Sequence, residues 1–229
     1  MNAKYAKYLI EKTKDYFDKN VDSFSGSRKE LWPELEELKK HIKDKEKILD
    51  LGCGNGRLFE LFKNKKVEYI GVDFSEKFIK KAREKYGNHF MVADAFNLPL
   101  PDSFFDSIWA IAFFHHIPSK HLKLKILKEI KQTLKKNGKL VMTCWYLYQP
   151  QYLKLLLKFF FRKLFGMSKL DFKDILLSSK KLKVQRYYHA FTKRELKKLF
   201  QKAGFKVEEL KYLKRNNKKT NILIVATRP

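Results

Sequence analysis

The stretch KILDLGCGNGRL, residues 47–58, decides the fold. Its first five residues have the apolar character of a short buried strand, and apolar residues resume at helical spacing over residues 57–63. Three glycines stand between these parts at alternate positions: Gly52, Gly54 and Gly56. Glycines in a strand-to-helix turn allow backbone angles closed to other residues and let a ligand approach the backbone. The stretch is either a plain turn or a seat for a ligand.

The downstream sequence repeats this alternation of strands and helices. Strands are expected at 47–51, 67–73, 89–95, within 105–117 and at 139–146. Helices are expected at 76–86 and 119–136, the second ended by Asn137-Gly138 as its C-cap. Such alternation predicts an α/β fold with a doubly wound parallel sheet, and ligands bind such sheets at the carboxyl ends of their strands.

The flanking segments complete one predicted domain over residues 1–229. Residues 1–45 are expected to form an N-terminal helical cap, and residues 149–185 a basic helical insertion. A capping box at Thr192 then opens a helix to about Lys202, and residues 205–213 and 220–227 form a closing hairpin.

Acidic residues follow the first three predicted strands. Asp50 ends the first, Asp73 the second, and Asp94 with Ala95 the third. A carboxylate after the second strand is well placed to accept both hydroxyls of a ribose. The G-x-G-x-G spacing is tighter than the dinucleotide fingerprint, and no G-K-[ST] follows. These residues therefore predict a ligand with a ribose and a base but no diphosphate.

Together these motifs resemble the S-adenosylmethionine (SAM) site of a class I methyltransferase. The resemblance covers residues 47–146 and implies a Rossmann-like, mostly parallel seven-stranded sheet with an antiparallel last strand. It also implies SAM as cofactor and assigns its binding to seven residues: Asp50, Gly52, Gly54, Gly56, Asp73, Asp94 and Ala95.

Further stretches resemble the tRNA methyltransferases that esterify a carboxymethyl group on the wobble uridine. The match is carried by Arg28, Trp32-Pro33, His115-His116 and RYYH at 186–189. It implies a carboxymethyl- or carboxymethoxy-type uridine as acceptor, tRNA as partner, and a small zinc-containing activator subunit. Two alternatives stay open: a methyltransferase of a small or lipid-like, quinone-type acceptor, and a non-catalytic RNA-binding subunit of the same fold.

Several residues are candidates for the acceptor side. Arg28 and Arg186 are expected to clamp a carboxylate or phosphate, since a guanidinium offers a bidentate fork; each could instead be a surface ion pair. His116 follows the fourth strand and could donate a hydrogen bond to the acceptor or simply pack. Tyr187, Tyr188 and His189 could stack a flipped-out uridine or be ordinary strand aromatics.

Charge points to a polyanionic partner. The formal net charge is +26, and residues 151–229 hold 22 Lys/Arg against 5 Asp/Glu. Residues 152–165 could meet RNA phosphates through Lys154 and Arg162, lie on a membrane surface, or supply a core or partner interface. Two cysteines, no metal-ligand cluster and no signal-peptide pattern at the start of the chain favour a cytoplasmic protein without a bound metal.

Overall fold

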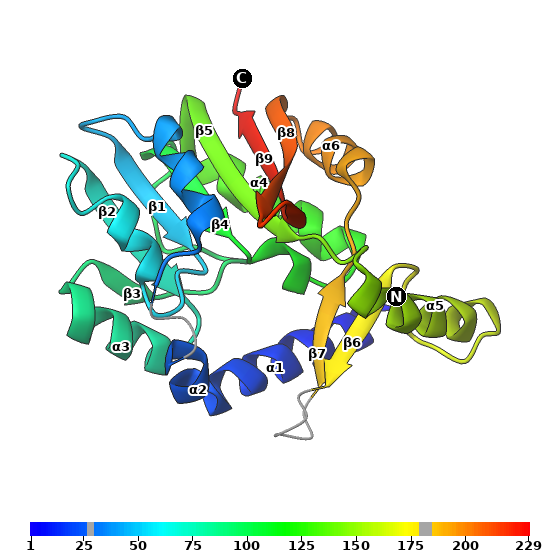
Figure 1. Cartoon of the computed structure of the whole chain (residues 1–229). Coiled ribbons are helices and arrows are strands. Elements are labelled where there is room, and N and C mark those ends of the chain that lie inside the picture. The colour runs from blue at the N-terminus through cyan, green and yellow to red at the C-terminus, as the bar shows by residue number, and fades with distance from the viewer. Residues whose placement is uncertain (27–29, 179–184) are drawn as a thin grey trace.

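One seven-stranded sheet runs through the computed structural model, which describes residues 1–26, 30–178 and 185–229 (Figure 1). The strands of this sheet are β1 Lys47–Leu51, β2 Glu68–Asp73, β3 Phe90–Val92, β4 Phe105–Ile111, β5 Leu134–Trp145, β8 Lys206–Arg215 and β9 Lys218–Thr227. The α-helices are α1 Ala3–Lys19, α2 Val21–Gly26, α3 Glu76–Tyr86, α4 Lys120–Thr133, α5 Pro150–Leu164 and α6 Lys193–Lys202. The 3₁₀ helices of the described ranges are η1 Pro33–His41, η2 Arg57–Leu61 and η3 Phe114–His116. Within the described ranges, no helix is both long enough and apolar enough to cross a membrane.

The strand order β3-β2-β1-β4-β5-β9-β8 places the topological switch between β1 and β4. The first five strands of that order pair in parallel, and β9 runs antiparallel to both β5 and β8. This confirms the predicted doubly wound, mostly parallel sheet with an antiparallel last strand. Ligands bind such sheets in the crevice beyond the carboxyl ends at the switch point.

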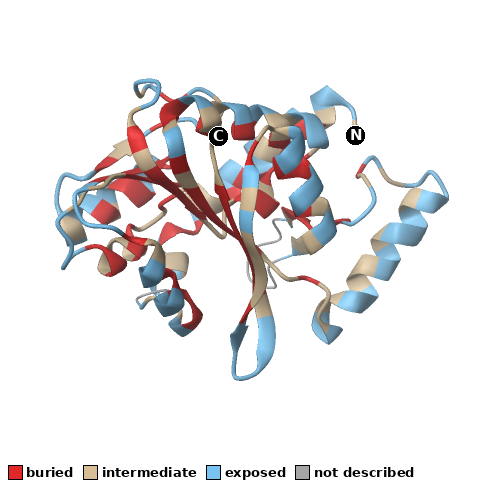
Figure 2. Ribbon diagram, turned by 90° about the horizontal axis from the view of Figure 1, so that it is seen from above, coloured by how far each residue is buried: buried red, intermediate tan, exposed pale blue. Residues whose placement is uncertain are grey.

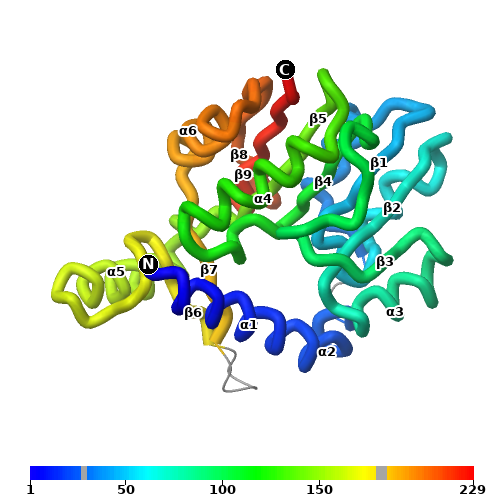
Figure 3. Tube along the Cα trace, turned by 180° about the vertical axis from the view of Figure 1, so that it is seen from behind, coloured from blue at the N-terminus to red at the C-terminus, as the bar shows by residue number. Residues whose placement is uncertain are grey.

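Both faces of the sheet are covered, and β1 shows how. Leu49 and Leu51 pack into the core beneath α4 and α6. Ile48, the residue before Leu49, points to the opposite core under η1, η2 and α3. Because successive side chains of a strand alternate between faces, a strand buried on both sides is apolar almost throughout. The carboxyl ends of β1, β2 and β4 form the edge of the sheet that the amino-terminal helices cross (Figure 3).

Helices α1 and α2 run along that carboxyl edge (Figures 1 and 3). Their attachment is polar as well as apolar: the Ser75 hydroxyl donates to Asp18 Oδ1 at 2.5 Å, and Lys81 pairs with Asp22 at 2.7 Å. Phe17 also packs on Phe78 of α3. The amino-terminal helices are therefore fixed to α3 and close one side of the crevice.

The insertion differs from its prediction. It holds α5, and then a two-stranded antiparallel sheet of β6 Asp174–Ser178 and β7 Gln185–His189, where helix was expected throughout residues 149–185. The pairing places Ile175 opposite Tyr188, and both are fully buried. The helical prediction is wrong for residues 174–178 and 185, because this cross-strand pairing outweighs the local pattern; residues 179–184 lie outside the described part.

Helix α4 also ends earlier than predicted. It stops at Thr133, and β5 begins at Leu134, which pairs with Phe105. Asn137 has φ +60°, and its N–H donates to the Arg228 carbonyl at 2.7 Å. Asn137-Gly138 is thus an irregularity inside β5 rather than the cap of α4. The segment is part of β5 because it forms backbone hydrogen bonds with neighbouring parts of the chain.

Candidate functional site

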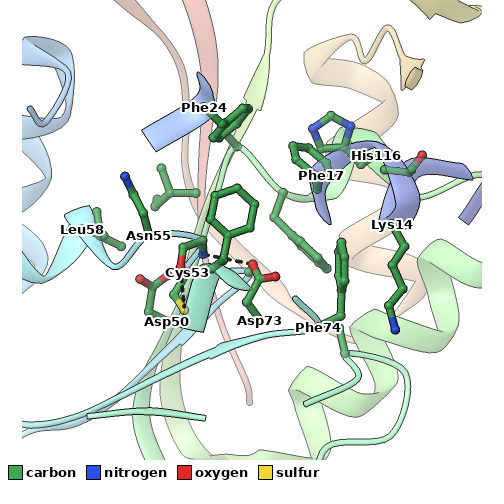
Figure 4. Close-up of a pocket in the computed structure, with 18 of the residues that line it drawn as sticks. Lys14, Phe17, Phe24, Asp50, Cys53, Asn55, Leu58, Asp73, Phe74 and His116 are labelled. Carbon is green, nitrogen blue, oxygen red and sulfur yellow. Dashed lines mark hydrogen bonds between the residues drawn. The ribbon is translucent and has the colours of Figure 1, made fainter. Parts of the chain in front are cut away.

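The glycine turn after β1 wraps around the end of β2. The N–H groups of Gly52 and Cys53 both donate to the Val72 carbonyl, at 2.8 and 3.0 Å. Gly54 N–H donates to Asp73 Oδ2 at 3.0 Å, a contact drawn as a dashed line in Figure 4. The turn and the carboxylate that was predicted to hold a ribose therefore form one unit.

Gly52 and Gly54 are needed for different reasons. Both have positive φ, +75° and +55°. A Cβ on Gly52 would lie 2.6 Å from the Phe113 ring, whereas a Cβ on Gly54 would meet no atom within 4 Å. Gly52 therefore permits close packing, and Gly54 leaves open space beside Asp73 that a ligand can fill.

Asp73 is held in place by backbone donors. Its Oδ1 accepts from Ser75 N–H at 3.0 Å, in addition to the Gly54 contact on Oδ2. Burial raises its pKa from the ordinary 3.8 to about 6, and the backbone hydrogen bonds limit that rise. Asp73 is thus a fixed acceptor that is ionised at neutral pH.

Asp50 lies deeper. It is buried, and its Oδ2 accepts from the Tyr69 hydroxyl at 2.6 Å. Burial raises its pKa to about 7, with the Tyr69 hydrogen bond opposing the shift. A carboxylate in this setting gains most from a cationic ligand group, which would compensate for its desolvation.

These groups line one cavity of about 470 Å³ at the carboxyl edge of the sheet (Figure 4). Six of the seven predicted cofactor residues border it, namely Asp50, Gly52, Gly54, Asp73, Asp94 and Ala95. Gly56 does not border it: its φ is +76°, and a Cβ there would lie 2.8 Å from the Phe90 ring. The structure thus gives Gly56 a packing role in the turn. Asp94 is exposed, and its Oδ1 accepts from Phe96 N–H at 2.9 Å.

Comparison with known proteins identifies the family. The sequence profile of the methyltransferase domain family matches residues 49–142. An uncharacterised protein of Methanocaldococcus jannaschii is 30% identical over 200 residues, covering 85% of this chain and 76% of that one. The chain belongs to the class I SAM-dependent methyltransferases.

Two relatives have names that state a substrate. The "tRNA (carboxymethyluridine(34)-5-O)-methyltransferase" of Schizosaccharomyces pombe is 29% identical over 218 residues, covering 90% of this methyltransferase and 93% of that protein. The Arabidopsis thaliana protein of the same name is 33% identical over 129 residues, which is 56% of this chain. The chain spans only 31% of the length of the Arabidopsis protein.

Solved structures agree on the fold. A Methanosarcina mazei SAM-dependent methyltransferase superposes with a TM-score of 0.73 at 22% identity, covering 87% of this chain and 98% of its own. A chain from the complex of the Haloferax volcanii Trm112 methyltransferase activator with a methyltransferase superposes with a TM-score of 0.69 at 18% identity, covering 95% and 97%.

The residues around the cavity suit SAM. Asp73 can accept two ribose hydroxyls, the space at Gly54 admits a ligand against the backbone, and Asp50 can face an ammonium group. Phe74, Asp94 and Ala95 border the part of the cavity after β2 and β3, where a base would lie. When bound, SAM supplies a methyl group already activated by its sulfonium charge.

A pair of glycines tests this fit. Gly54 (φ +55°) borders the cavity, whereas Gly166 (φ +71°) does not, and a Cβ on either meets nothing within 4 Å. Each change to alanine is expected to cost about 1–2 kcal/mol of unfolding free energy, because a Cβ disfavours a left-handed backbone. Only Gly54→Ala is expected to weaken SAM binding, by at least about tenfold, because only that methyl group enters the cavity. Calorimetric titration compares the two; equal SAM affinity in both variants would contradict the assignment.

The raised pKa of Asp73 predicts pH-dependent cofactor binding. Protonation removes acceptor capacity from a carboxyl group, so SAM affinity should fall as pH drops below about 6, by up to about tenfold per pH unit. Binding near this pH should release a proton, which calorimetry in buffers of different ionisation enthalpy detects. Because the pKa of Asp50 also lies within this window, at about 7, the Asp73→Asn variant serves as the control that isolates Asp73. A SAM affinity that is flat between about pH 5 and 7 would contradict this prediction.

Two of the three predicted catalytic residues border the same cavity. His116 borders it, and its Nδ1 donates to the Tyr187 carbonyl at 3.2 Å. Arg186 also borders it, with the guanidinium 4.3 Å above the Tyr16 ring. Arg186 Nε is buried without a hydrogen-bond partner within the described ranges. Arg28, the third, lies outside the described residues.

The predicted stacking platform is not available in this structure. Tyr187 is buried with its hydroxyl donating to Asp174 at 2.7 Å, and His189 lies between Asp174 (2.6 Å) and Glu195 (2.7 Å). The Tyr188 ring is fully buried and stacks on both His115 and Trp145. None of the three rings has an exposed face for a base, because β6, α6, η3 and β5 supply partners that sequence alone did not reveal.

The other predicted contacts lie away from the cavity. Lys154 and Arg162 are exposed on α5 and do not border it. Trp32 does not border it either; the Arg57 guanidinium lies 4.1 Å above its ring, and it packs on the core under η1. Trp32 is therefore part of the packing under η1.

Sequence analysis missed the residues that α1 and α2 contribute. Ile10, Thr13, Lys14, Phe17 and Phe24 all border the cavity. Phe17 also meets the His116 ring edge-on at 5.2 Å (Figure 4). The amphipathic spacing of α1 was a usable signal, but it did not show that the apolar side faces a ligand site rather than the core.

Proposed function

We propose that this methyltransferase esterifies the carboxylate of a carboxymethyl- or carboxymethoxy-type wobble uridine in tRNA. The observation that carries the proposal is Arg186, which borders the cavity and whose Nε is buried without a hydrogen-bond partner among the described residues. A guanidinium in that state favours a bidentate anion. The Schizosaccharomyces pombe relative, aligned over 90% of this chain, is named for this reaction on carboxymethyluridine.

In the proposed reaction, the main role of the protein is to position the carboxylate against the methyl group of SAM. A carboxylic acid titrates near pH 4, so the nucleophile is already ionised at neutral pH. Arg186 would hold the carboxylate, with Arg28 as a second proposed clamp and His116 as a hydrogen-bond donor to the acceptor. Alignment of this kind is worth roughly 7–11 kcal/mol when the reacting atoms are held in contact.

The proposed partners follow from charge and from the comparisons. The excess of 22 basic over 5 acidic residues in 151–229 suits tRNA phosphates. The Haloferax volcanii structural neighbour was solved with the Trm112 activator, so we include a small activator subunit in the proposal. Transfer assays should therefore be run with and without such a subunit.

The experiment compares tRNA substrates. Purified protein, labelled SAM and tRNA bearing carboxymethyl- or carboxymethoxy-uridine should give labelled tRNA, and tRNA with unmodified wobble uridine should not. Binding to tRNA should weaken steeply as salt rises. Transfer that is equal on unmodified tRNA, or absent from all tRNA with the activator present, would reject the proposed acceptor.

A second candidate rests on the walls of the cavity. Phe17, Phe24, Phe74 and Phe113 make much of its lining apolar. This lining favours a small, quinone-type acceptor, whose methylation would respond little to salt. The same labelled SAM with a soluble quinol analogue decides between the candidates: label in the quinol and none in tRNA would favour the second.

A further inference from the structure

Helix α5 and the loop after it present apolar side chains to solvent. We define this α5 surface as Leu153, Leu157, Phe160, Phe161, Leu164, Phe165, Met167 and Phe172, all exposed. Phe165 is 69% exposed and Leu157 56%. In Figure 2, α5 projects at the right of the molecule without any buried residue. Exposed apolar residues that gather in this way mark an interaction site.

These residues are not needed to hold α5 in place. A different face of the helix packs on the protein, through Tyr152, Leu155, Leu156 and Phe159. The exposed residues of the helix recur at i, i+4, i+7, i+8 and i+11 from Leu153, which makes a stripe along its length. Phe160 meets Phe172 at 5.6 Å between ring centroids, so the stripe continues onto the following loop.

Positive charge borders this stripe. Residues 150–170 contain five basic side chains and no acidic one. Lys154, Lys158, Arg162 and Lys169 are exposed, and Lys163 is half-buried. An exposed helix with large apolar side chains, several cationic ones and no acidic one has the composition of helices that lie in the interface of anionic membranes.

We propose that the α5 surface docks this methyltransferase on a membrane that carries anionic lipids. A helix of 15 residues is about 22 Å long, shorter than the roughly 30 Å hydrocarbon core, so α5 would lie in the plane of the surface. Leu157, Phe161 and Leu164 would enter the acyl boundary. The lysines and Arg162 would reach the phosphates while their aliphatic stems stay on the apolar side.

Other occupants fit less well. RNA offers phosphates to the lysines and base faces to the phenylalanines, but it offers no apolar partner for Leu153, Leu157 and Leu164. A second copy of the chain would bring two sets of five unopposed cations together, in a protein with net charge +26. Of these three occupants, only a lipid surface offers partners to both the apolar and the cationic side chains.

The docked surface lies next to the acceptor side of the enzyme. Helix α5 contacts β6, and β6 pairs with β7, which carries Arg186. A membrane under α5 would therefore place this side of the methyltransferase near the bilayer. The proposal is independent of whether tRNA is the acceptor.

Vesicle flotation tests the apolar part. The full chain should float with equimolar phosphatidylcholine and phosphatidylglycerol vesicles, and much less with phosphatidylcholine alone. The double variant Leu157→Ser with Phe161→Ser should partition roughly a hundredfold more weakly, since each buried apolar side chain contributes several-fold to tenfold or more. Tyr8→Ser is the control, because Tyr8 is similarly exposed at 48% but lies outside the α5 surface.

Charge variants complete the test. Replacing Lys154, Lys158 and Arg162 by glutamine should weaken partition into anionic vesicles by roughly a hundredfold. The same number of charges removed from α6, at Lys197, Lys198 and Lys202, should have a much smaller effect. Absence of flotation, or flotation unchanged in the α5 variants, overturns the proposal. Loss of tRNA affinity or of a dimer in the Leu157/Phe161 variant, without a loss of flotation, would assign the surface to RNA or to a second copy instead.

Discussion

Replacing Asp73 by asparagine is expected to weaken SAM binding by about a hundredfold and leave the fold intact. The carboxylate ends β2, is held by Gly54 and Ser75 N–H groups, and borders the cavity. Hydrogen bonds to a charged group contribute about 1.5–3 kcal/mol each. In the variant, two ribose hydroxyls would face a neutral amide in place of a carboxylate, and part of this binding free energy would be lost. Isothermal titration of SAM into wild type and variant measures the difference.

The stability of the Asp73→Asn variant separates binding from folding. The folded-state pKa of about 6 lies above the ordinary 3.8, so the folded protein holds this proton more tightly than the unfolded chain does. The free energy of unfolding due to this group therefore falls as pH rises from about 4 to 6. At pH 7 the variant lacks that destabilisation but loses one of the two backbone hydrogen bonds, because its amide nitrogen cannot accept one. Its free energy of unfolding should therefore stay within about 1–3 kcal/mol of wild type, enough to keep the protein folded.

Asp94→Asn is the matched control for Asp73. Asp94 also borders the cavity but is exposed, so its contribution is screened by water and its change should weaken SAM binding by less than about tenfold. Equal losses in the two variants, or unchanged affinity in Asp73→Asn, would show that SAM is not held as we describe.

Replacing Arg186 by lysine is expected to lower kcat/KM for the carboxyl-bearing tRNA by about a hundredfold to a thousandfold. Removal of one preorganised hydrogen-bond donor from a reacting oxygen typically lowers the rate by about this factor. Lysine keeps the charge, but it cannot form the bidentate fork. SAM affinity should not change, because Arg186 lies on the acceptor side.

The control for Arg186 is Arg194→Lys. Arg194 is exposed at the start of α6 and does not border the cavity, so its change should leave kcat/KM within about twofold. The melting temperature should be followed as well, since Arg186 also stacks on Tyr16. Unchanged kcat/KM in a folded Arg186→Lys variant would remove the carboxylate clamp from the mechanism.

The cofactor half of the site could be predicted from sequence because its determinants are local. Gly52, Gly54 and Asp73 follow strands whose apolar patterns are clear, and parallel strands bring their carboxyl ends to one edge. Gly56 was the exception: its neighbour Phe90 comes from β3, so its packing role was not visible from the turn alone.

The acceptor half depends on contacts between distant segments. In the sequence, Tyr187 and His189 look like aromatic residues that are free to stack on a base. In the structure, Asp174 forms hydrogen bonds with the Tyr187 hydroxyl and with Nδ1 of His189, although it lies thirteen and fifteen residues before them in the chain. Phe17 and Phe24 reach the cavity only because α1 and α2 are fixed to α3. The residue pattern of one segment does not reveal contacts with distant segments, so the burial of these side chains could not be predicted from sequence.

The chemical stability of the transferred methyl group tests the central claim most directly. Carboxyl methyl esters release methanol in mild alkali, whereas methyl groups on nitrogen, carbon or ether oxygen remain. With methyl-labelled SAM, carboxymethyl- or carboxymethoxy-uridine tRNA and an activator subunit, we expect the label in tRNA to become volatile methanol after alkali. Label that stays on the tRNA after alkali would contradict a carboxylate acceptor.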